Sequence, residues 1–264
     1  MRRTTADIKE RKGRAPLAML TAYDYPTARL LDEAGADLLL VGDSLGMVVL
    51  GYPTTVQVTL EEILHHAKAV VRGSEAAMVV ADLPFLTYQV SPEEALRNAG
   101  RLIQEGGVQA VKLEGGRAIA GTVHRLVAAG IPVMGHIGLT PQSIHQLGGY
   151  RTQGRTPDEA ARLIDEAKVL EEAGAFAIVL ECIPPALARV ITEQVSIPTI
   201  GIGCGPDCDG QVQVIHDLIG FTNGYLPKHA RRYTDVSASV LQAARRYVED
   251  VQQKTFLREK LSCE

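Results

Sequence analysis

Ionisable side chains stand at the ends of five short apolar runs. These side chains are Asp43, Asp82, Lys112 with Glu114, His136 and Glu181. If the runs are parallel strands of one barrel, their carboxyl ends share the face on which such barrels carry catalytic groups. Lys112 and Glu114 are two residues apart, so a strand would direct both to the same side. Four carboxylates in one cleft repel one another, and one lysine cannot neutralise them. Either some are protonated or a cation lies among them.

Taken one at a time, these residues have ordinary explanations. A carboxylate after a strand is the N-cap of the next helix about as often as it is a functional group. A histidine in that place is more often a packing residue than a catalyst. The series of five favours a site. Oxygen ligands without nearby thiols suit a hard ion such as Mg²⁺, whose open positions a 2-oxo acid could fill with two oxygens. The ion would acidify the carbon next to the carbonyl, and an unliganded carboxylate such as Glu181 could act as the base.

The elements that must position these groups alternate along the chain. Seven runs rich in Val, Ile, Leu and Ala predict buried parallel strands, at residues 17–21, 38–41, 78–81, 110–113, 132–135, 177–180 and 199–202. An eighth run, 212–216, fits either a strand or a helix. Amphipathic stretches lie between most of the runs, and three begin with a capping box, Thr59 with Glu62, Ser91 with Glu94, and Thr156 with Glu159. This alternation predicts a parallel sheet.

The length of the chain indicates how that sheet closes. At 264 residues, it is close to the roughly 250 residues of a (β/α)8 TIM barrel. We expect one barrel domain over residues 1–264, with an N-terminal extension at 1–16 and a C-terminal helix and tail at 235–264. Residues 141–155 follow the fifth strand and are long, polar and glycine-containing, which predicts a lid or wall of the site.

Composition and charge exclude several classes of protein. Hydrophobic residues make up 46% and charged residues 22%, which excludes a disordered or fibrous chain. The net charge of −4 argues against nucleic acid as a partner, since phosphate binding needs a basic face. The N-terminus lacks the apolar core of a secretory signal, and no run is long enough to span a membrane. Four scattered cysteines do not form a disulfide scaffold, so we expect a soluble, cytoplasmic protein.

Three other patterns receive ordinary interpretations. His65 and His66 diverge on their helix and lie off its apolar face, so we expect both on the solvated surface. Cys204 and Cys208 have the wrong spacing for a redox CxxC motif and no second pair for zinc, so they are taken as incidental thiols. The glycines from 201 to 205 resemble a phosphate cradle only weakly, and a tight turn explains them as well.

Several motifs resemble the ketopantoate hydroxymethyltransferase family. They are TAYDYPTARLLDEAG at 21–35, VGDSLGMVVLGYPTT at 41–55, ADLPF at 81–85, VKLEGG at 111–116, GHIGLTPQS at 135–143, GGYRTQGR at 148–155 and ECIP at 181–184. The resemblance runs in order over almost the whole chain, and GDSLGM, KLEGG and GHIGLTPQS are specific in combination. Three segments depart from the family pattern, at Cys204, at His229 and in the C-terminal tail TFLREKLSCE, and none touches the expected metal site.

The resemblance implies a fold, a reaction and a set of roles. The family has a (β/α)8 barrel, assembles as a homodecamer and transfers a hydroxymethyl group from 5,10-methylenetetrahydrofolate to 3-methyl-2-oxobutanoate, giving 2-dehydropantoate for pantothenate synthesis. By this resemblance, Asp43, Asp82 and Glu114 are the Mg²⁺-site acids, with Glu114 acting through a water. Ser44 and Lys112 match the positions that hold the carboxylate and carbonyl of the substrate, His136 lines the pocket, and Glu181 matches the catalytic acid/base.

Two rival functions remain open from the sequence. The acidic cleft does not name the electrophile, so another lyase or mutase working through a 2-oxo acid enolate fits it too. A barrel that only binds a ligand is the third hypothesis. The presence of both a base, Glu181, and the metal acids Asp43 and Asp82 speaks against it, because a pure binder needs no base.

Overall fold

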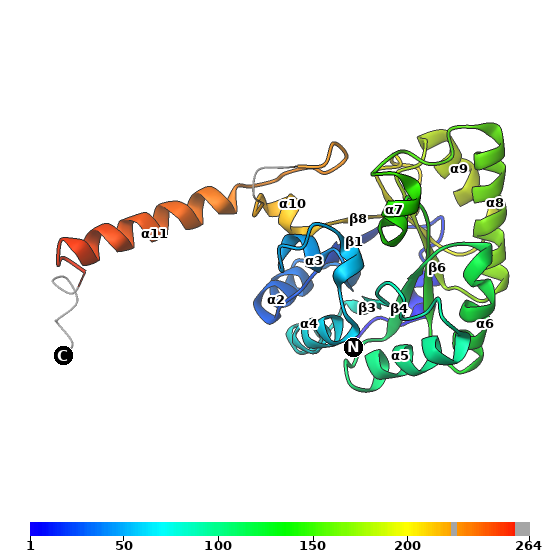
Figure 1. Ribbon diagram of the computed structural model, residues 1–264, viewed down its shortest axis with the longest axis horizontal. Helices are drawn as coiled ribbons and strands as arrows, with labels where there is room; N and C mark the ends of the chain where they lie inside the picture. Colours follow the sequence, from blue (N-terminus) through cyan, green and yellow to red (C-terminus); the bar gives the residue numbers. More distant parts are fainter. Residues whose placement is uncertain (223–225, 257–264) are drawn as a thin grey trace. The chain divides into compact units, whose positions relative to one another are not determined.

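A computed structural model of the chain describes residues 1–222 and 226–256. The chain divides into two compact units, Met1–Val214 and Ile215–Glu264. In the first unit, eight parallel strands form a closed barrel in the order β1 to β8, surrounded by helices (Figure 1). The TIM barrel expected from the alternation of strands and helices is therefore confirmed.

The strands follow the seven predicted runs and add an eighth. They are β1 Leu17–Thr21, β2 Leu38–Val41, β3 Met78–Asp82, β4 Ala110–Glu114, β5 Val133–Gly138, β6 Ala177–Glu181, β7 Thr199–Ile202 and β8 Gly210–Gln213. Strands β3 to β6 end later than predicted, so Asp82, Glu114, His136 and Glu181 lie within strands rather than after them. Strand geometry rather than loop conformation therefore sets where these side chains point.

The eighth strand lies earlier than the predicted run at 212–216. It covers Gly210–Gln213, and the short helix α10, Ile215–Ile219, takes the rest of that run. Gly210 pairs with Leu17 of β1 and so closes the barrel. A Cβ at position 210 would lie 2.6 Å from the Leu17 carbonyl oxygen, so only glycine lets β8 approach β1 this closely.

The helices of the first unit precede β1 or connect successive strands. They are α1 Thr5–Lys9, α2 Tyr25–Glu33, α3 Leu45–Val48, α4 Leu60–Gly73, α5 Pro92–Gln104, α6 Ala120–Ala128, α7 Ile144–Leu147, α8 Pro157–Glu172 and α9 Pro185–Gln194, with 3₁₀ turns η1 Thr55–Gln57, η2 Arg117–Ile119 and η3 Pro141–Ser143. The capping boxes predicted for α4 and α8 are present with both reciprocal hydrogen bonds. In α5, the Ser91 side chain accepts a hydrogen bond from the Glu94 amide.

Apolar side chains fill the barrel and leave its carboxyl end polar. The core cluster includes Met19, Leu40, Met78, Val80, Met134, Val179 and Ile200. The N-terminal extension adds Ile8 of α1 to this cluster, with no exposed surface. Because Arg3 and Arg11 of the extension pair with Asp37, just before β2, the extension covers the amino-terminal end of the barrel.

The second unit contains α10 and the long helix α11, Val236–Gln252. Asp235 caps α11 by accepting a hydrogen bond from the Ala238 amide. None of the residues of α11 is buried. The predicted tail at 235–264 thus begins as a helix, and residues 257–264, including Cys263, lie outside the described residues.

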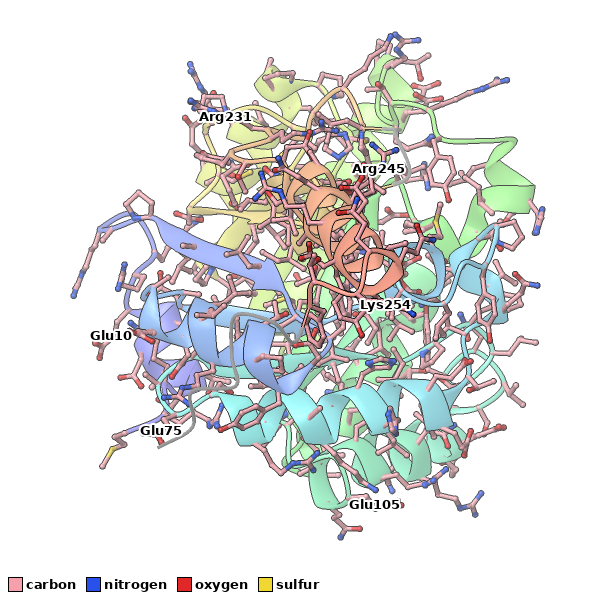
Figure 2. All side chains as sticks on the ribbon, turned by 90° about the vertical axis from the view of Figure 1, so that its left-hand side faces the viewer. Glu10, Glu75, Glu105, Arg231, Arg245 and Lys254 are labelled. Carbon is pink, nitrogen blue, oxygen red and sulfur yellow. The ribbon has the colours of Figure 1, made fainter. Side chains whose placement is uncertain are left out.

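Many charged side chains away from the barrel interior are exposed. Figure 2 shows Glu10, Glu75 and Glu105 directed away from the ribbon, and all three are exposed. Across residues 1–222 and 226–256, no helix combines the length and the apolar character needed to cross a membrane. The cytoplasmic location stays a prediction.

Candidate active site

The carboxyl ends of β2 to β6 bring the predicted residues together. Strand register places Asp82 beside Lys112 and Glu114 beside His136. Lys112 and His136 are almost fully buried, as are Asp43, Asp82 and Glu114, which are 4%, 2% and 6% exposed. Glu181, at the end of β6, is partly exposed and borders the buried group.

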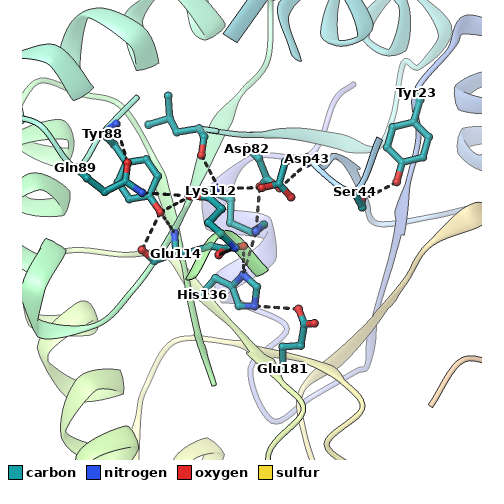
Figure 3. A network of polar contacts seen from close by, with 12 residues as sticks. Tyr23, Asp43, Ser44, Asp82, Tyr88, Gln89, Lys112, Glu114, His136 and Glu181 are labelled. Carbon is teal, nitrogen blue, oxygen red and sulfur yellow. Dashed lines mark hydrogen bonds and ion pairs between the residues drawn. The ribbon is translucent and has the colours of Figure 1, made fainter. Parts of the chain in front are cut away.

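An unbroken chain of charged contacts runs from Asp82 to Glu181 (Figure 3). Lys112 Nζ lies 3.1 Å from Asp82 Oδ1 and 3.1 Å from His136 Nδ1. His136 Nδ1 is also 3.4 Å from Glu114 Oε1, and its Nε2 lies 3.1 Å from Glu181 Oε2. The imidazole therefore joins the buried acids to Glu181, whose side chain is 15% exposed.

The charge state of this chain follows from its neighbours. Burial lowers the pKa of Lys112, but the charges of Asp82, Glu114 and Asp43 outweigh burial and raise it overall, so the ammonium stays charged. Burial and Lys112 lower the pKa of His136, and hydrogen bonds to Glu114 and Glu181 raise it to about 9 overall. His136 can therefore hold a proton between two carboxylates. The ring is neutral when Nδ1 accepts from Lys112, and it donates to Glu114 when it is an imidazolium.

Asp43 and Asp82 form a second part of the site. The Asp43 amide donates to Asp82 Oδ2 at 3.0 Å, which holds the two carboxyl groups at neighbouring strand ends. Burial raises the pKa of Asp43 well above its usual value, and the charges of Asp82 and Glu114 raise it further. Burial also raises the pKa of Asp82, against the lowering effect of Lys112. Ionising both acids would therefore leave an excess of buried negative charge that Lys112 offsets only in part.

A resident cation would relieve this imbalance, and part of the donor set fits Mg²⁺. Within the described chain, the buried Asp82 Oδ1 accepts no well-aligned hydrogen bond and faces only the Lys112 ammonium. No three His, Cys, Asp or Glu side chains among the described residues are placed to hold one ion together. The donors that fit are therefore Asp43 and Asp82, with waters or substrate completing the shell, as Mg²⁺ prefers. The role of Glu114 through a water stays a prediction.

Ser44 follows Asp43 and is held by a tyrosine that the sequence analysis missed. Ser44 Oγ and Tyr23 OH are 2.8 Å apart. Burial raises the pKa of Tyr23, so its hydroxyl stays protonated and can orient Ser44. A Cβ at Gly42 would lie 2.9 Å from Ser44 Oγ, so a side chain at position 42 would crowd this hydroxyl.

Gln142 is the second residue of the site that residue type and spacing did not indicate. It lies at the start of the segment 141–155, which begins with η3 and α7. Gln142 is buried and donates from Nε2 to Asp43 Oδ2 at 2.9 Å and to Leu83 O at 3.0 Å. Its backbone amide donates to Glu114 Oε2 at 2.9 Å. One residue of this segment thus holds two acids of the site.

The side-chain oxygen of Gln142 also accepts hydrogen bonds. Tyr88 OH lies 2.8 Å from Gln142 Oε1, and Gln89 Nε2 donates to the same oxygen at 3.3 Å. Because the Leu83 carbonyl can only accept, the amide can have only one orientation. Gln142 was within the GHIGLTPQS motif, but nothing in its type or spacing distinguished it from neighbouring polar residues.

The expectation for the histidine pair is wrong for one member. His65 is exposed, as predicted, but His66 is partly buried and its Nδ1 lies 2.6 Å from the backbone oxygen of Tyr23. This contact links α4 to the segment that carries Tyr23. Helix spacing alone predicts a surface position for His66, because it takes no account of contacts with the segment before α2.

Comparisons with known proteins agree on the family. The model of the family described as ketopantoate hydroxymethyltransferase matches residues 2–259. A 3-methyl-2-oxobutanoate hydroxymethyltransferase of Carboxydothermus hydrogenoformans is 60% identical over 98% of this chain and 94% of its own length. The protein of the same name from Dehalococcoides mccartyi strain CBDB1 is 59% identical over 97% of this chain and 92% of its own length.

A solved structure supports the fold alone. The phosphoenolpyruvate phosphomutase of Streptomyces platensis subsp. rosaceus has a TM-score of 0.64 at 14% identity, over 98% of this chain and 92% of its own. The family assignment rests instead on the family model and on the relatives near 60% identity. The chain is therefore a transferase that belongs to the ketopantoate hydroxymethyltransferase family.

Proposed function

We propose that this enzyme transfers a hydroxymethyl group from 5,10-methylenetetrahydrofolate to 3-methyl-2-oxobutanoate, with one Mg²⁺ per subunit, giving 2-dehydropantoate. The names of relatives near 60% identity support this substrate. The single observation that carries the mechanism is the buried chain from Asp82 through Lys112 and His136 to Glu181. It provides a cation, a proton-holding imidazole and a carboxylate in series.

Each residue of the site has a separate role in this mechanism. Ser44, oriented by Tyr23, and Lys112 bind the carboxylate and carbonyl oxygens of the 2-oxo acid. Mg²⁺ held by Asp43 and Asp82 would polarise the carbonyl and so acidify C3. Glu181 takes the C3 proton because it reaches the opening while its other side contacts His136 at 3.1 Å. The contact with His136 Nε2 also holds the Glu181 carboxylate in place.

The balance of the reaction assigns the remaining atoms. The C3 enolate attacks the methylene carbon of the folate, forming the new carbon–carbon bond and breaking one of the two carbon–nitrogen bonds. Water replaces the second nitrogen and supplies the hydroxyl oxygen of the product. The C3 proton and one proton of that water end on the two folate nitrogens, so the reaction balances. Burial of Lys112, His136 and Glu114 keeps bulk water from protonating the enolate from that side.

We also propose that the enzyme acts as a homo-oligomer, with a decamer as the expected state. Helix α11 supports association because it is amphipathic and buries none of its residues within the chain. Its exposed apolar side chains are Val240, Leu241, Tyr247, Val248 and Val251. Such a continuous apolar face favours a covering partner, and a second copy of the chain supplies one.

Exchange of the C3 proton tests the reaction directly. Purified enzyme is incubated with 3-methyl-2-oxobutanoate in D₂O, with Mg²⁺ or with a chelator, and deuterium incorporation is followed by NMR. Metal-dependent exchange that is lost in Glu181→Gln supports the proposal, and adding the methylene-folate should then give 2-dehydropantoate. Exchange without product formation points to another 2-oxo acid enzyme. No exchange by folded protein overturns the enolate step.

A further inference from the structure

The segment between β7 and β8 holds two thiols in contact. Cys204 Sγ and Cys208 Sγ are 3.6 Å apart, although their spacing in the sequence indicates incidental thiols. Both lie against Gly201 of β7, where an added Cβ would meet Cys204 Sγ at 2.8 Å and Cys208 Sγ at 3.1 Å. The absence of a side chain at position 201 therefore makes the space that the two sulfur atoms share.

The backbone around Cys204 is shaped to turn its side chain inward. Gly203 and Gly205 flank it with φ values of 67° and 85°, a conformation that favours glycine. Cys204 is fully buried, whereas Cys208 is only partly so. The pair thus has one partly exposed residue and one fully buried residue.

The two thiols also differ in acidity. The hydrogen bond from Cys204 lowers the pKa of the Cys208 thiol, against the effect of burial. The same hydrogen bond, together with burial, raises the pKa of Cys204. The more accessible sulfur is therefore the better thiolate, the arrangement found in reactive cysteine pairs. Once Cys208 is bonded to another sulfur, its thiolate no longer raises the pKa of Cys204.

We propose that Cys204 and Cys208 form a reversible intramolecular disulfide by exchange with a low-molecular-weight disulfide. The Cys208 thiolate attacks one sulfur of the small disulfide, forms a mixed disulfide and releases the other half as a thiolate. Cys204 then attacks Cys208 Sγ, and its proton passes to the second half, which is released as a thiol. The two protein thiols are oxidised, and the small disulfide is reduced to two thiols. Closure needs the protein sulfurs to approach by about 1.5 Å.

The disulfide would form on the catalytic face of the barrel. The segment follows β7, whose Ile202 pairs with Glu181 of β6. The Ile202 carbonyl also accepts a hydrogen bond from the amide of Cys182 at 2.9 Å. Closing the ring between positions 204 and 208 would fix the backbone beside the strand that carries Glu181.

Mass spectrometry of protein equilibrated in glutathione buffers tests the proposal. No Lys or Arg lies between Arg189 and Lys228, so both thiols fall on one tryptic peptide. In oxidised buffer we expect this peptide to lose two hydrogen masses and resist alkylation, and to recover on reduction. The peptide carrying Cys182 should stay alkylated, because that thiol has no part in the pair.

Two single variants separate the roles of the thiols. Cys204→Ser should trap Cys208 as a stable mixed disulfide with glutathione, because the resolving thiol is missing. Cys208→Ser should leave the buried Cys204 unmodified. The proposal is overturned if folded wild-type protein forms no 204–208 disulfide in fully oxidised buffer, if Cys204 pairs with Cys182 instead, or if both single variants react alike.

Discussion

Gln142 donates a hydrogen bond from its side-chain amide to Asp43 Oδ2 at 2.9 Å, across 99 positions of sequence. Its backbone amide holds Glu114 as well, and Tyr88 fixes the far end of its side chain. The position of two acids of the site therefore depends on one neutral residue. This residue belongs to the segment after β5, not to a strand end.

Gln142→Ala should weaken Mg²⁺ or Mn²⁺ binding by about tenfold or more, the usual effect of losing a residue that orients a metal ligand. Asp43 loses a donor, and its carboxylate is no longer held beside Asp82. Titration calorimetry of the folded variant measures the affinity. Gln146→Ala is the matched control, since Gln146 is exposed in the same segment. Equal metal affinity in the two variants would contradict the role of Gln142.

Glu181→Gln should slow turnover about a hundredfold or more and leave substrate binding largely intact, because the amide cannot accept the C3 proton. Steady-state kinetics separate kcat from KM. Glu172→Gln makes the same change at an exposed position of α8 and should have wild-type kinetics. Turnover at the wild-type rate in Glu181→Gln would refute the assignment of the base.

Lys112→Ala should mainly raise the KM for the 2-oxo acid, because the ammonium that faces the site is lost. The variant also leaves Asp82 without its ion-pair partner at 3.1 Å, so its thermal unfolding is measured first, and kinetics are taken only where it is folded. A change confined to kcat would mean that Lys112 does not contact the substrate in the ground state.

Asp32→Asn should destabilise the protein by about 2 kcal/mol at neutral pH, because the carboxylate accepts hydrogen bonds from the amides of Glu75, Ala76 and Ala77. Burial raises the pKa of Asp32, but these hydrogen bonds outweigh it and lower the pKa overall. The stabilisation is therefore present above the pKa of Asp32 in the unfolded state, about 4. It is lost as the pH falls through the lower pKa of the folded state.

Urea unfolding from pH 7 to pH 3 checks this dependence. The difference in the free energy of unfolding between wild type and Asp32→Asn should become smaller toward pH 3, because the wild-type carboxyl is protonated there. Glu33→Gln, at the exposed neighbouring position, should differ little from wild type throughout. A constant difference across the range would mean that the charge of Asp32 is not what stabilises the α4–β3 connection.

Leu241→Glu with Val248→Glu should shift the enzyme to a smaller assembly, because both side chains lie on the exposed apolar face of α11. Light scattering after size-exclusion chromatography measures the mass. Gln242→Glu adds charge to the polar side of the same helix and should leave the assembly unchanged. An unaltered mass in the double variant would show that this face is not an interface between subunits.

The sequence by itself determined the barrel and the acids at its carboxyl end. Short apolar runs separated by capped amphipathic helices are local patterns, and parallel strands in register bring their ends together wherever the runs occur. Asp82, Lys112, Glu114, His136 and Glu181 could therefore be placed on one face from their positions alone. The bounds of the eighth strand could not be predicted, because the role of Gly210 depends on its close approach to β1 and not on a local sequence pattern.

Only the tertiary structure decided which residues outside the strands serve those acids. Gln142, Tyr88 and Tyr23 come from connecting segments whose conformation depends on what they pack against. The contacts of His66 with Tyr23 and of Cys204 with Cys208 depend in the same way on how those segments lie in space. Strand ends are fixed by a repeating backbone geometry that sequence patterns report. Side chains of connecting segments meet only after the chain closes, so residue types and spacing do not predict their partners.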